Sequence, residues 1–140
     1  MFYFDLMAAV IPILLLAPWI CISDIRFHRI PNVALLVLWV LNEVEAISLD
    51  RAHFEAAHET LIALFAISIS AKYLFRGAMG MGDVKLMTLL GFAVRSLRNS
   101  LSVLVIACIF GLLWALFSRK SAIPFAPALI GAALLELLTQ

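Results

Sequence analysis

The sequence has few charged residues. Of its 140 residues, only 14% are Asp, Glu, Lys or Arg, whereas soluble domains carry about a quarter. Hydrophobic residues make up 65% of the chain, and its mean hydropathy is +1.11. These values predict a membrane protein with little room for a separate soluble domain. The chain also has no run of Lys and Arg, which argues against a nucleic-acid partner.

Cysteine is scarce as well. Cys21 and Cys108 are the two cysteines of the chain, and they lie far apart with no CxxC pair. A zinc site needs about four ligands at close spacing, so these residues do not indicate a metal centre, and we expect no cofactor. Both cysteines are predicted to be small buried apolar side chains.

Six apolar segments follow one another, and each is a candidate for a helix that spans a membrane. They lie at about 6–22, 31–48, 58–75, 82–99, 100–117 and 122–138. The sequence therefore predicts an all-α polytopic membrane protein of about six transmembrane helices, built as one membrane-embedded domain over residues 1–140. The fourth segment is the weakest, because it spans only if Lys85 and Arg95 snorkel. The first is predicted to be a retained helix rather than a signal peptide, because its positive residues follow the apolar run.

The Lys and Arg residues are divided unequally between the two predicted sides. Seven of the ten fall in the connections after the first, third and fifth segments. These are Arg26, Arg29, Lys72, Arg76, Lys85, Arg119 and Lys120, whereas Arg51, Arg95 and Arg98 fall on the other side. The positive-inside rule then predicts that the first side is cytoplasmic and that both termini lie outside.

The longest polar connection covers about residues 42–58. We expect a short amphipathic helix there, lying on the outer face with Val44, Ile47 and Phe54 toward lipid. His53 and His58 fall within this connection, and we expect them to be solvated rather than to bind a metal or sense pH.

Two acids, Asp24 and Asp83, fall on the predicted cytoplasmic side, each at a boundary of an apolar segment. Ionisable residues at membrane depth are candidates for function. The simpler alternative is that each acid neutralises a nearby cation. The candidate partners are Arg26 or Arg29 for Asp24, and Lys85 or Arg76 for Asp83.

Taken together, the two acids indicate an aspartyl dyad. Two carboxylates in one site cannot both ionise, so one stays protonated as general acid while the other activates water as general base. Gly80 and Gly82 directly precede Asp83, and glycine lets a backbone approach an extended substrate closely. The alternatives are a flexible turn and a phosphate-binding loop, but the P-loop spacing and its preceding strand are missing.

These residues resemble a known family. The stretch "GMGD" at residues 80–83 resembles the GxGD signature of membrane aspartyl proteases, and its extension to Lys85 resembles GxGDxK. Asp24, followed by Ile30-Pro31-Asn32, resembles the first catalytic segment of type IV prepilin peptidases. "IPFAPAL" at residues 123–129 resembles that family's IPFGPxL before its last helix.

The chain departs from the family pattern in two respects. Ala126 stands where the family usually has glycine. A cytoplasmic segment with two CxxC pairs, which the long members combine with methyltransferase activity, is absent from this sequence. The chain therefore resembles the short, peptidase-only branch, similar to enzymes that serve Flp/Tad pili or archaeal preflagellins, with no zinc-binding or methyltransferase segment.

The resemblance implies an aspartic endopeptidase that removes the leader of prepilin-like precursors at the cytoplasmic face of the inner membrane. It implies catalytic roles for Asp24 and Asp83, substrate contacts for Gly80, Gly82 and Lys85, structural roles for Pro31, Asn32 and Pro124, and no metal or other cofactor. The precursor and the lipid bilayer are the expected partners. The alternative is a non-enzymatic membrane protein, either a proton-coupled carrier or an assembly scaffold. A carrier would place its acids near the bilayer midplane.

Overall fold

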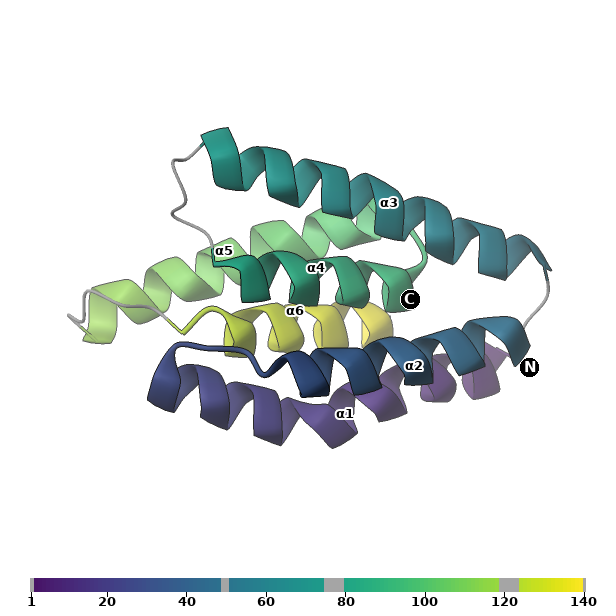
Figure 1. Cartoon of the computed structure of the whole chain (residues 1–140), viewed down its shortest axis with the longest axis horizontal. Coiled ribbons are helices and arrows are strands. Elements are labelled where there is room, and N and C mark those ends of the chain that lie inside the picture. The colour runs from purple at the N-terminus through teal and green to yellow at the C-terminus, as the bar shows by residue number, and fades with distance from the viewer. Residues whose placement is uncertain (1, 49–50, 75–79, 119–123, 140) are drawn as a thin grey trace.

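The computed structural model describes residues 2–48, 51–74, 80–118 and 124–139. These residues form six α-helices and no strands (Figure 1). The helices are α1 (Phe2–Phe27), α2 (Asn32–Ser48), α3 (Arg51–Leu74), α4 (Met81–Val94), α5 (Leu97–Ser118) and α6 (Ala126–Thr139). The prediction of an all-helical chain with six helices is confirmed.

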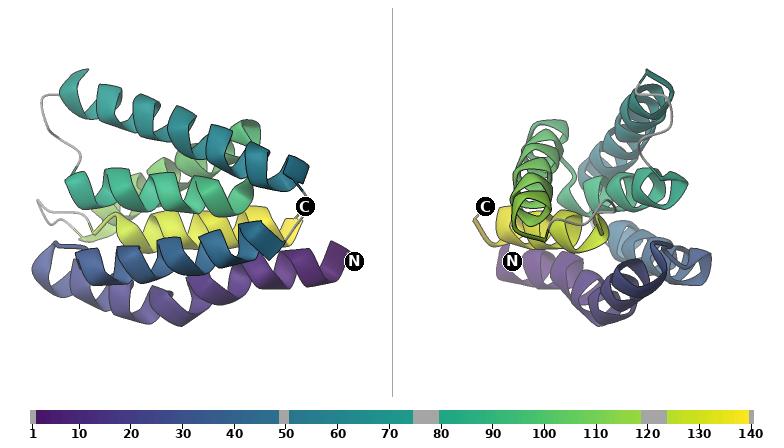
Figure 2. Two further views of the ribbon diagram at one scale, coloured as in Figure 1. Left: turned by 45° about the vertical axis from the view of Figure 1, so that its right-hand side comes forward. Right: turned by 90° about the vertical axis from the view of Figure 1, so that its left-hand side faces the viewer.

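Successive helices run in opposite directions along one bundle (Figures 1 and 2). As a result α1, α3 and α5 end where α2, α4 and α6 begin, and both Asp24 and Asp83 lie at this end, called here the aspartate end. The start of α1 and the end of α6 lie together at the opposite end, called the far end (Figure 2). The buried core contains side chains from all six helices.

Three of the six helices are long and apolar enough to cross a membrane by themselves: α1 over Ala9–Phe27, α3 over Arg51–Leu74 and α5 over Leu97–Phe117. The other described helices are shorter, and α4 has 14 residues. At about 1.5 Å per residue α4 is about 21 Å long, less than the hydrocarbon thickness of about 30 Å. The predicted fourth segment, 82–99, therefore contains a helix that ends at Val94, and α5 begins at Leu97.

The short α4 is the central helix of the bundle. Every residue from 86 to 94 is buried, and α4 contacts each of the other five helices. The fourth segment was predicted to span only if Lys85 and Arg95 snorkel. In the structure Lys85 binds Asn32 and Arg95 binds Glu45. A helix that is covered by its neighbours has no need to match the thickness of the bilayer.

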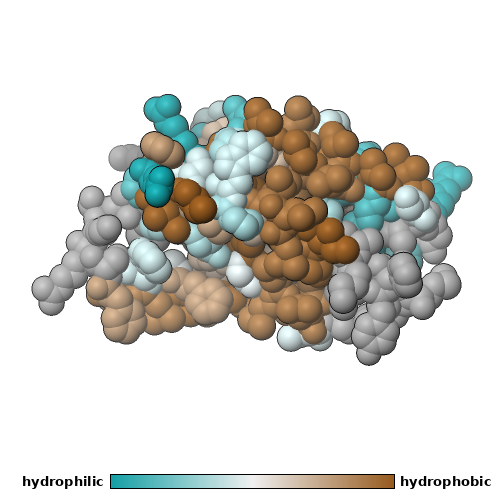
Figure 3. All heavy atoms as spheres, turned by 90° about the horizontal axis from the view of Figure 1, so that it is seen from below, coloured by the Kyte–Doolittle hydropathy of each residue, from teal (hydrophilic) through white to brown (hydrophobic). Residues whose placement is uncertain are grey.

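The outer surface of the bundle is apolar, as a chain in lipid requires. Large side chains such as Ile62, Leu116 and Phe117 are exposed, and brown apolar residues fill the centre of the face in Figure 3, with hydrophilic residues toward its ends. Cys108 belongs to this surface, so its predicted burial was wrong, whereas Cys21 is half-buried. The apolar exterior and the three long helices support an integral membrane protein.

The predicted outer amphipathic helix over 42–58 does not exist as a separate element. Residues 42–48 continue α2, and residues 51–58 begin α3. Val44 is exposed as expected, but Phe54 packs with the buried cluster of Ala46, Ala57 and Phe92. The prediction for Phe54 failed because it considered only the segment itself, whereas α2, α3 and Phe92 of α4 pack together here.

The prediction for His58 was also wrong. Its ring is half-buried against Phe92, and its two nitrogens lie 2.9 Å from the Phe54 carbonyl oxygen and 3.2 Å from Glu43 Oε1. His53, by contrast, is exposed as expected.

Glu45 and Arg95 form a buried ion pair at the far end. The exposed fractions of their side chains are 9% and 13%. Arg95 is the C-cap of α4, has a left-handed backbone with φ 57°, and its N–H donates to the Gly91 carbonyl. The pair joins α2 to the end of α4, and therefore helps to fix the position of α4 in the bundle.

We expect that Glu45→Ala destabilises the protein by about 3–5 kcal/mol, because it leaves the Arg95 guanidinium buried without this carboxylate. The matched control is Glu55→Ala, which removes the exposed Arg51–Glu55 pair and should change stability by less than about 1 kcal/mol. The free energy of unfolding of each purified variant in detergent, compared with that of the wild type, measures the two effects. Equal effects of the two variants would contradict a stabilising role for the buried pair.

Candidate active site

Asp24 lies in the last turns of α1. The helix continues to Phe27, past the predicted boundary at residue 22, so the carboxylate is carried by regular helix and is only 6% exposed. The next residue, His28, has a left-handed backbone with φ 49°, and its N–H donates to the Asp24 carbonyl at 2.9 Å. Ser23 Oγ donates to the Arg29 carbonyl at 2.9 Å. These bonds fix the turn into α2 and, with it, the position of Asp24.

The carboxylate of Asp24 binds the start of α6. Its Oδ2 accepts a hydrogen bond from the Ala126 N–H at 2.9 Å, and Ala126 is buried. Ala126 is the first residue of α6, and Pro127, in the next position, suits a first helical turn. The first N–H groups of a helix have no partner within it, and the helix dipole places positive charge there. The α6 N-terminus therefore suits a carboxylate anion.

Asp83 is the third residue of α4, and its carboxylate turns back over the start of that helix. Gly80 is the N-cap, and its backbone N–H has a small effect that lowers the pKa of Asp83. A Cβ at position 80 would lie 3.1 Å from Asp83 Oδ2. This arrangement resembles the second half of a capping box, in which an acidic residue at the third helical position binds the N-cap N–H.

Gly82 allows the start of α4 to pack against the turn between α1 and α2. A Cβ at this position would lie 3.1 Å from the Cβ of Ile30, closer than packed side chains ordinarily allow. The missing side chain thus brings the "GMGD" segment beside the Ile30-Pro31-Asn32 segment. Two elements that are about 50 residues apart in the sequence meet here.

The two carboxylates are close enough to interact electrostatically. Asp83 lies in the first turn of α4, outside the three long apolar helices. Its partial burial and, second, the negative charge of Asp24 raise the pKa of Asp83 from its usual value of 3.8 to about 6, against a smaller opposing effect of the Gly80 N–H. Burial and a like charge both penalise the charged form of an acid. Asp83 is thus protonated to a larger extent below pH 6 than an ordinary aspartic acid would be.

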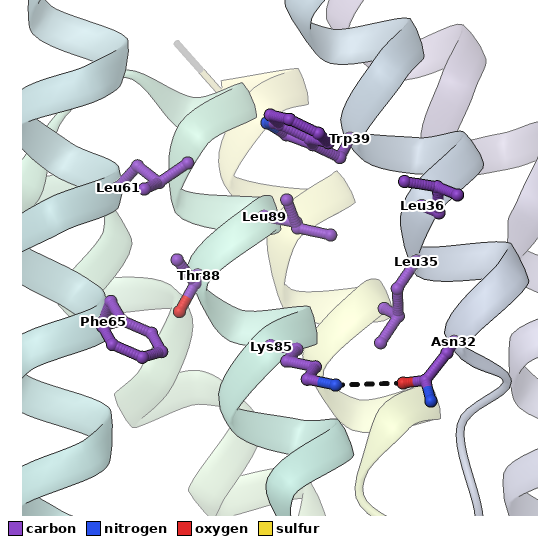
Figure 4. A pocket seen from close by; sticks show the side chains of 9 residues that line it. All are labelled: Asn32, Leu35, Leu36, Trp39, Leu61, Phe65, Lys85, Thr88 and Leu89. Carbon is purple, nitrogen blue, oxygen red and sulfur yellow. Dashed lines mark hydrogen bonds between the residues drawn. The ribbon is translucent and has the colours of Figure 1, made fainter.

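The simpler alternative, in which each acid pairs with a cation, is not found among the residues that the structure describes. Among the described residues, neither Asp24 nor Asp83 forms an ion pair. Lys85 Nζ instead donates to Asn32 Oδ1 at 3.0 Å (Figure 4). Arg26 and Arg29 are exposed, and Arg76 lies outside the described residues.

The other predicted residues also lie at the aspartate end. Pro31 directly precedes α2 and Pro124 stands two residues before α6. Within the part of the chain that the structure describes, no group of three His, Cys, Asp or Glu side chains is placed to hold a metal ion.

Sequence reasoning missed the Ala126 N–H as a partner of Asp24, and it missed Ser23. The "IPFAPAL" motif marked the correct segment for Ala126. However, every residue except proline has a main-chain N–H, so the amino-acid type at position 126 does not indicate that this N–H binds Asp24.

Comparison with known families gives one match. The sequence model of the type IV leader peptidase family matches residues 9–116, which include Asp24 and Asp83. A search among curated proteins and a search among solved structures found no significant match.

Proposed function

Because the chain belongs to the type IV leader peptidase family, we propose that it is an aspartyl endopeptidase that removes the leader of prepilin-like precursors. Membership supports a membrane peptidase. The aspartic mechanism is supported by the placement of Asp24 and Asp83 at one end of the bundle, where the negative charge of Asp24 helps to raise the pKa of Asp83. Gly80, Gly82 and Lys85 are proposed to contact the substrate, while Pro31, Asn32 and Pro124 hold the surrounding turns.

In the proposed mechanism the two acids have different roles. Asp24, which accepts the Ala126 N–H, is the ionised base that takes a proton from water. Asp83, whose pKa is raised to about 6, is the protonated acid and donates its proton to the scissile carbonyl oxygen as the water oxygen bonds to the carbon. The resulting tetrahedral intermediate collapses when its C–N bond breaks. The leaving nitrogen receives the proton that Asp24 holds, and Asp83 regains a proton from the intermediate's hydroxyl.

The proposed location is the inner membrane, with the active site at the cytoplasmic face. The alternation of the helices places Arg26, Arg29, Lys72 and Lys85 at the aspartate end and Arg51, Arg95 and Arg98 at the far end. Under the positive-inside rule the aspartate end is then cytoplasmic, and the two termini lie outside. The proposed peptidase domain covers residues 1–140.

The non-enzymatic alternatives are less well supported. A proton-coupled carrier would place its acids near the bilayer midplane, often beside broken helices. Here both acids lie at one end of the bundle, Asp24 in the last turns of α1 and Asp83 in the first turn of α4.

The direct test is proteolysis by the purified protein. The detergent-solubilised protein is incubated with a prepilin-like precursor, and the products are identified by mass spectrometry. We expect a single cut that separates the leader from the rest of the precursor. An intact precursor, with an active leader peptidase as positive control, would contradict the proposed function.

The pH dependence follows from the raised pKa of Asp83. The acid must be protonated, and its protonated fraction falls as the pH rises through about 6. We therefore expect kcat/KM to fall about tenfold for each pH unit above this value, and to fall again at low pH once the base is protonated. Rates measured between pH 4 and pH 8 would show a bell, whereas a rate that rises steadily toward pH 8 would exclude Asp83 as the acid.

A further inference from the structure

An apolar groove of about 470 Å³ lies on the side of the bundle where α1, α5 and α6 meet. One wall is formed by the last turns of α5, which include Trp114 and Phe117, and another by the start of α6, which includes Pro127. Ile25, near the end of α1, forms the third side. Each of the ten residues that line the groove is apolar, and its volume is within the range of specific binding sites, about 300–1,000 Å³.

The groove exists because α6 begins before the end of the helix against which it packs. Phe125, which directly precedes α6, lies level with Gly111 of α5, where an added Cβ would be 3.3 Å from the Phe125 ring. From Gly111, α5 continues for seven residues to Ser118, which is about 10 Å, and Figure 1 shows it extending past the start of α6. At the inner end, a Cβ added to Gly131 would meet no other described group within 4 Å. The groove therefore runs along the helix axes, from Phe117 at the aspartate end to Gly131 inside the bundle.

Arg26 provides a positive charge at the aspartate end of this groove. It directly follows Ile25, which lines the groove, and it stands one helical turn after Ile22, so these side chains share the outer face of α1. Ile22 and Ile25 are 52% and 50% exposed, and Arg26 is exposed as well. Among the described residues Arg26 forms no ion pair. Its guanidinium is therefore available to an anion, and it can donate two parallel N–H groups to a phosphate.

We propose that the groove binds an acyl chain of an anionic phospholipid, and that the headgroup phosphate of this lipid binds Arg26. The groove runs along the helix axes, as lipid chains do in a bilayer. Its positively charged end is also the end that the proposed orientation makes cytoplasmic. Anionic headgroups bind at basic sites between membrane helices on that side.

A hydrocarbon chain fits the groove better than a peptide strand does. Pro124 and Pro127 line the groove at the start of α6, and proline has no N–H with which to pair a strand. The apolar walls offer van der Waals contacts, and a hydrocarbon chain needs no other kind of partner.

The groove adjoins the contact that positions Asp24. Pro127 and Ala128 line the groove, and they directly follow Ala126, whose N–H donates to Asp24 Oδ2 at 2.9 Å. A bound acyl chain packs against this first turn of α6. The lipid therefore supports the helix start that holds the Asp24 carboxylate.

The test counts the lipids that the purified protein retains, by native mass spectrometry from micelles with equal amounts of phosphatidylglycerol and phosphatidylcholine. We expect the wild type to retain phosphatidylglycerol about tenfold more than phosphatidylcholine. Gly131→Leu fills the open space above Gly131 and should lower retention about tenfold. Gly131→Ala is the matched control. It also replaces a helical glycine by a better helix former, but it adds only one methyl group, so retention should stay within about twofold.

Arg26→Gln tests the headgroup contact, and it also serves if Gly131→Leu fails to accumulate. It should reduce the preference for phosphatidylglycerol from about tenfold to about one. The matched control is Arg98→Gln, which removes an exposed charge at the far end and should leave the preference unchanged. An unchanged preference in Arg26→Gln would overturn the phosphate contact.

Two other outcomes would overturn the lipid site. Equal retention of both lipids by the wild type, or equal retention by the two Gly131 variants, would indicate general contact with surrounding lipid only. A lipid-free dimer of the wild type that Gly131→Leu dissociates would assign the groove to a second copy of the chain. None of these measurements requires cleavage of a precursor, so the lipid site and the proposed function are tested separately.

Discussion

Replacing either Asp24 or Asp83 by Asn is expected to lower the cleavage rate by about 10³-fold or more. Asparagine preserves the size of the side chain, and at position 24 it can still accept the Ala126 N–H, but it cannot exchange the proton that the mechanism moves. The double variant should be no slower than either single one, because members of one catalytic unit do not act additively. The measurement is the cleavage rate of each of the three variants, divided by the amount of that variant in the membrane.

The same variants separate catalysis from stability. Because the folded state raises the pKa of Asp83 from 3.8 to about 6, stability is lost as the pH rises through that range and the buried acid ionises. Asp83→Asn removes this penalty, so at pH 7 it should be at least as stable as the wild type while inactive. Glu59→Gln, which changes an exposed acid on α3, is the control and should retain full activity. Near-normal turnover in either aspartate variant would exclude the two-acid mechanism.

Replacing Ala126 by Pro is expected to lower kcat/KM by about 10–100-fold, the equivalent of one hydrogen bond to a charged group. The substitution removes the N–H that donates to Asp24 Oδ2. Proline is favoured at the first position of a helix, which Ala126 occupies, so α6 itself should persist. The loss should fall on the chemical step, because Asp24 would no longer be held and stabilised as an anion.

Ala126→Gly is the matched control for this experiment. It keeps the N–H and removes one methyl group, so we expect kcat/KM within about threefold of the wild type. Thermal unfolding of both variants in detergent shows whether α6 remains packed. If Ala126→Pro is folded and as active as Ala126→Gly, then the hydrogen bond to Asp24 has no role in the reaction.

The sequence by itself determined the helical class, the number of helices and which two acids require an explanation. These properties depend on local features of the sequence. Such features are the length of an apolar run, the position of a proline and the glycines before Asp83. The motifs at Asp24 and at residues 80–83 also indicated the protein family. The match of the family model over residues 9–116 shows that the chain belongs to it. The weak fourth segment was correctly identified as unusual, because its charged ends are visible in the sequence.

The tertiary structure alone decided what those residues contact. The Ala126 N–H meets Asp24 across 102 residues, Lys85 meets Asn32 across 53, and Arg95 meets Glu45 across 50. Each of these contacts depends on which helices are neighbours, and an apolar helix in a bundle has several faces on which it can pack. The central position of α4 and the partial burial of His58 also depend on which helices are neighbours. Composition and spacing place a residue along a helix, whereas packing decides whether it faces lipid, a second helix or the reacting bond.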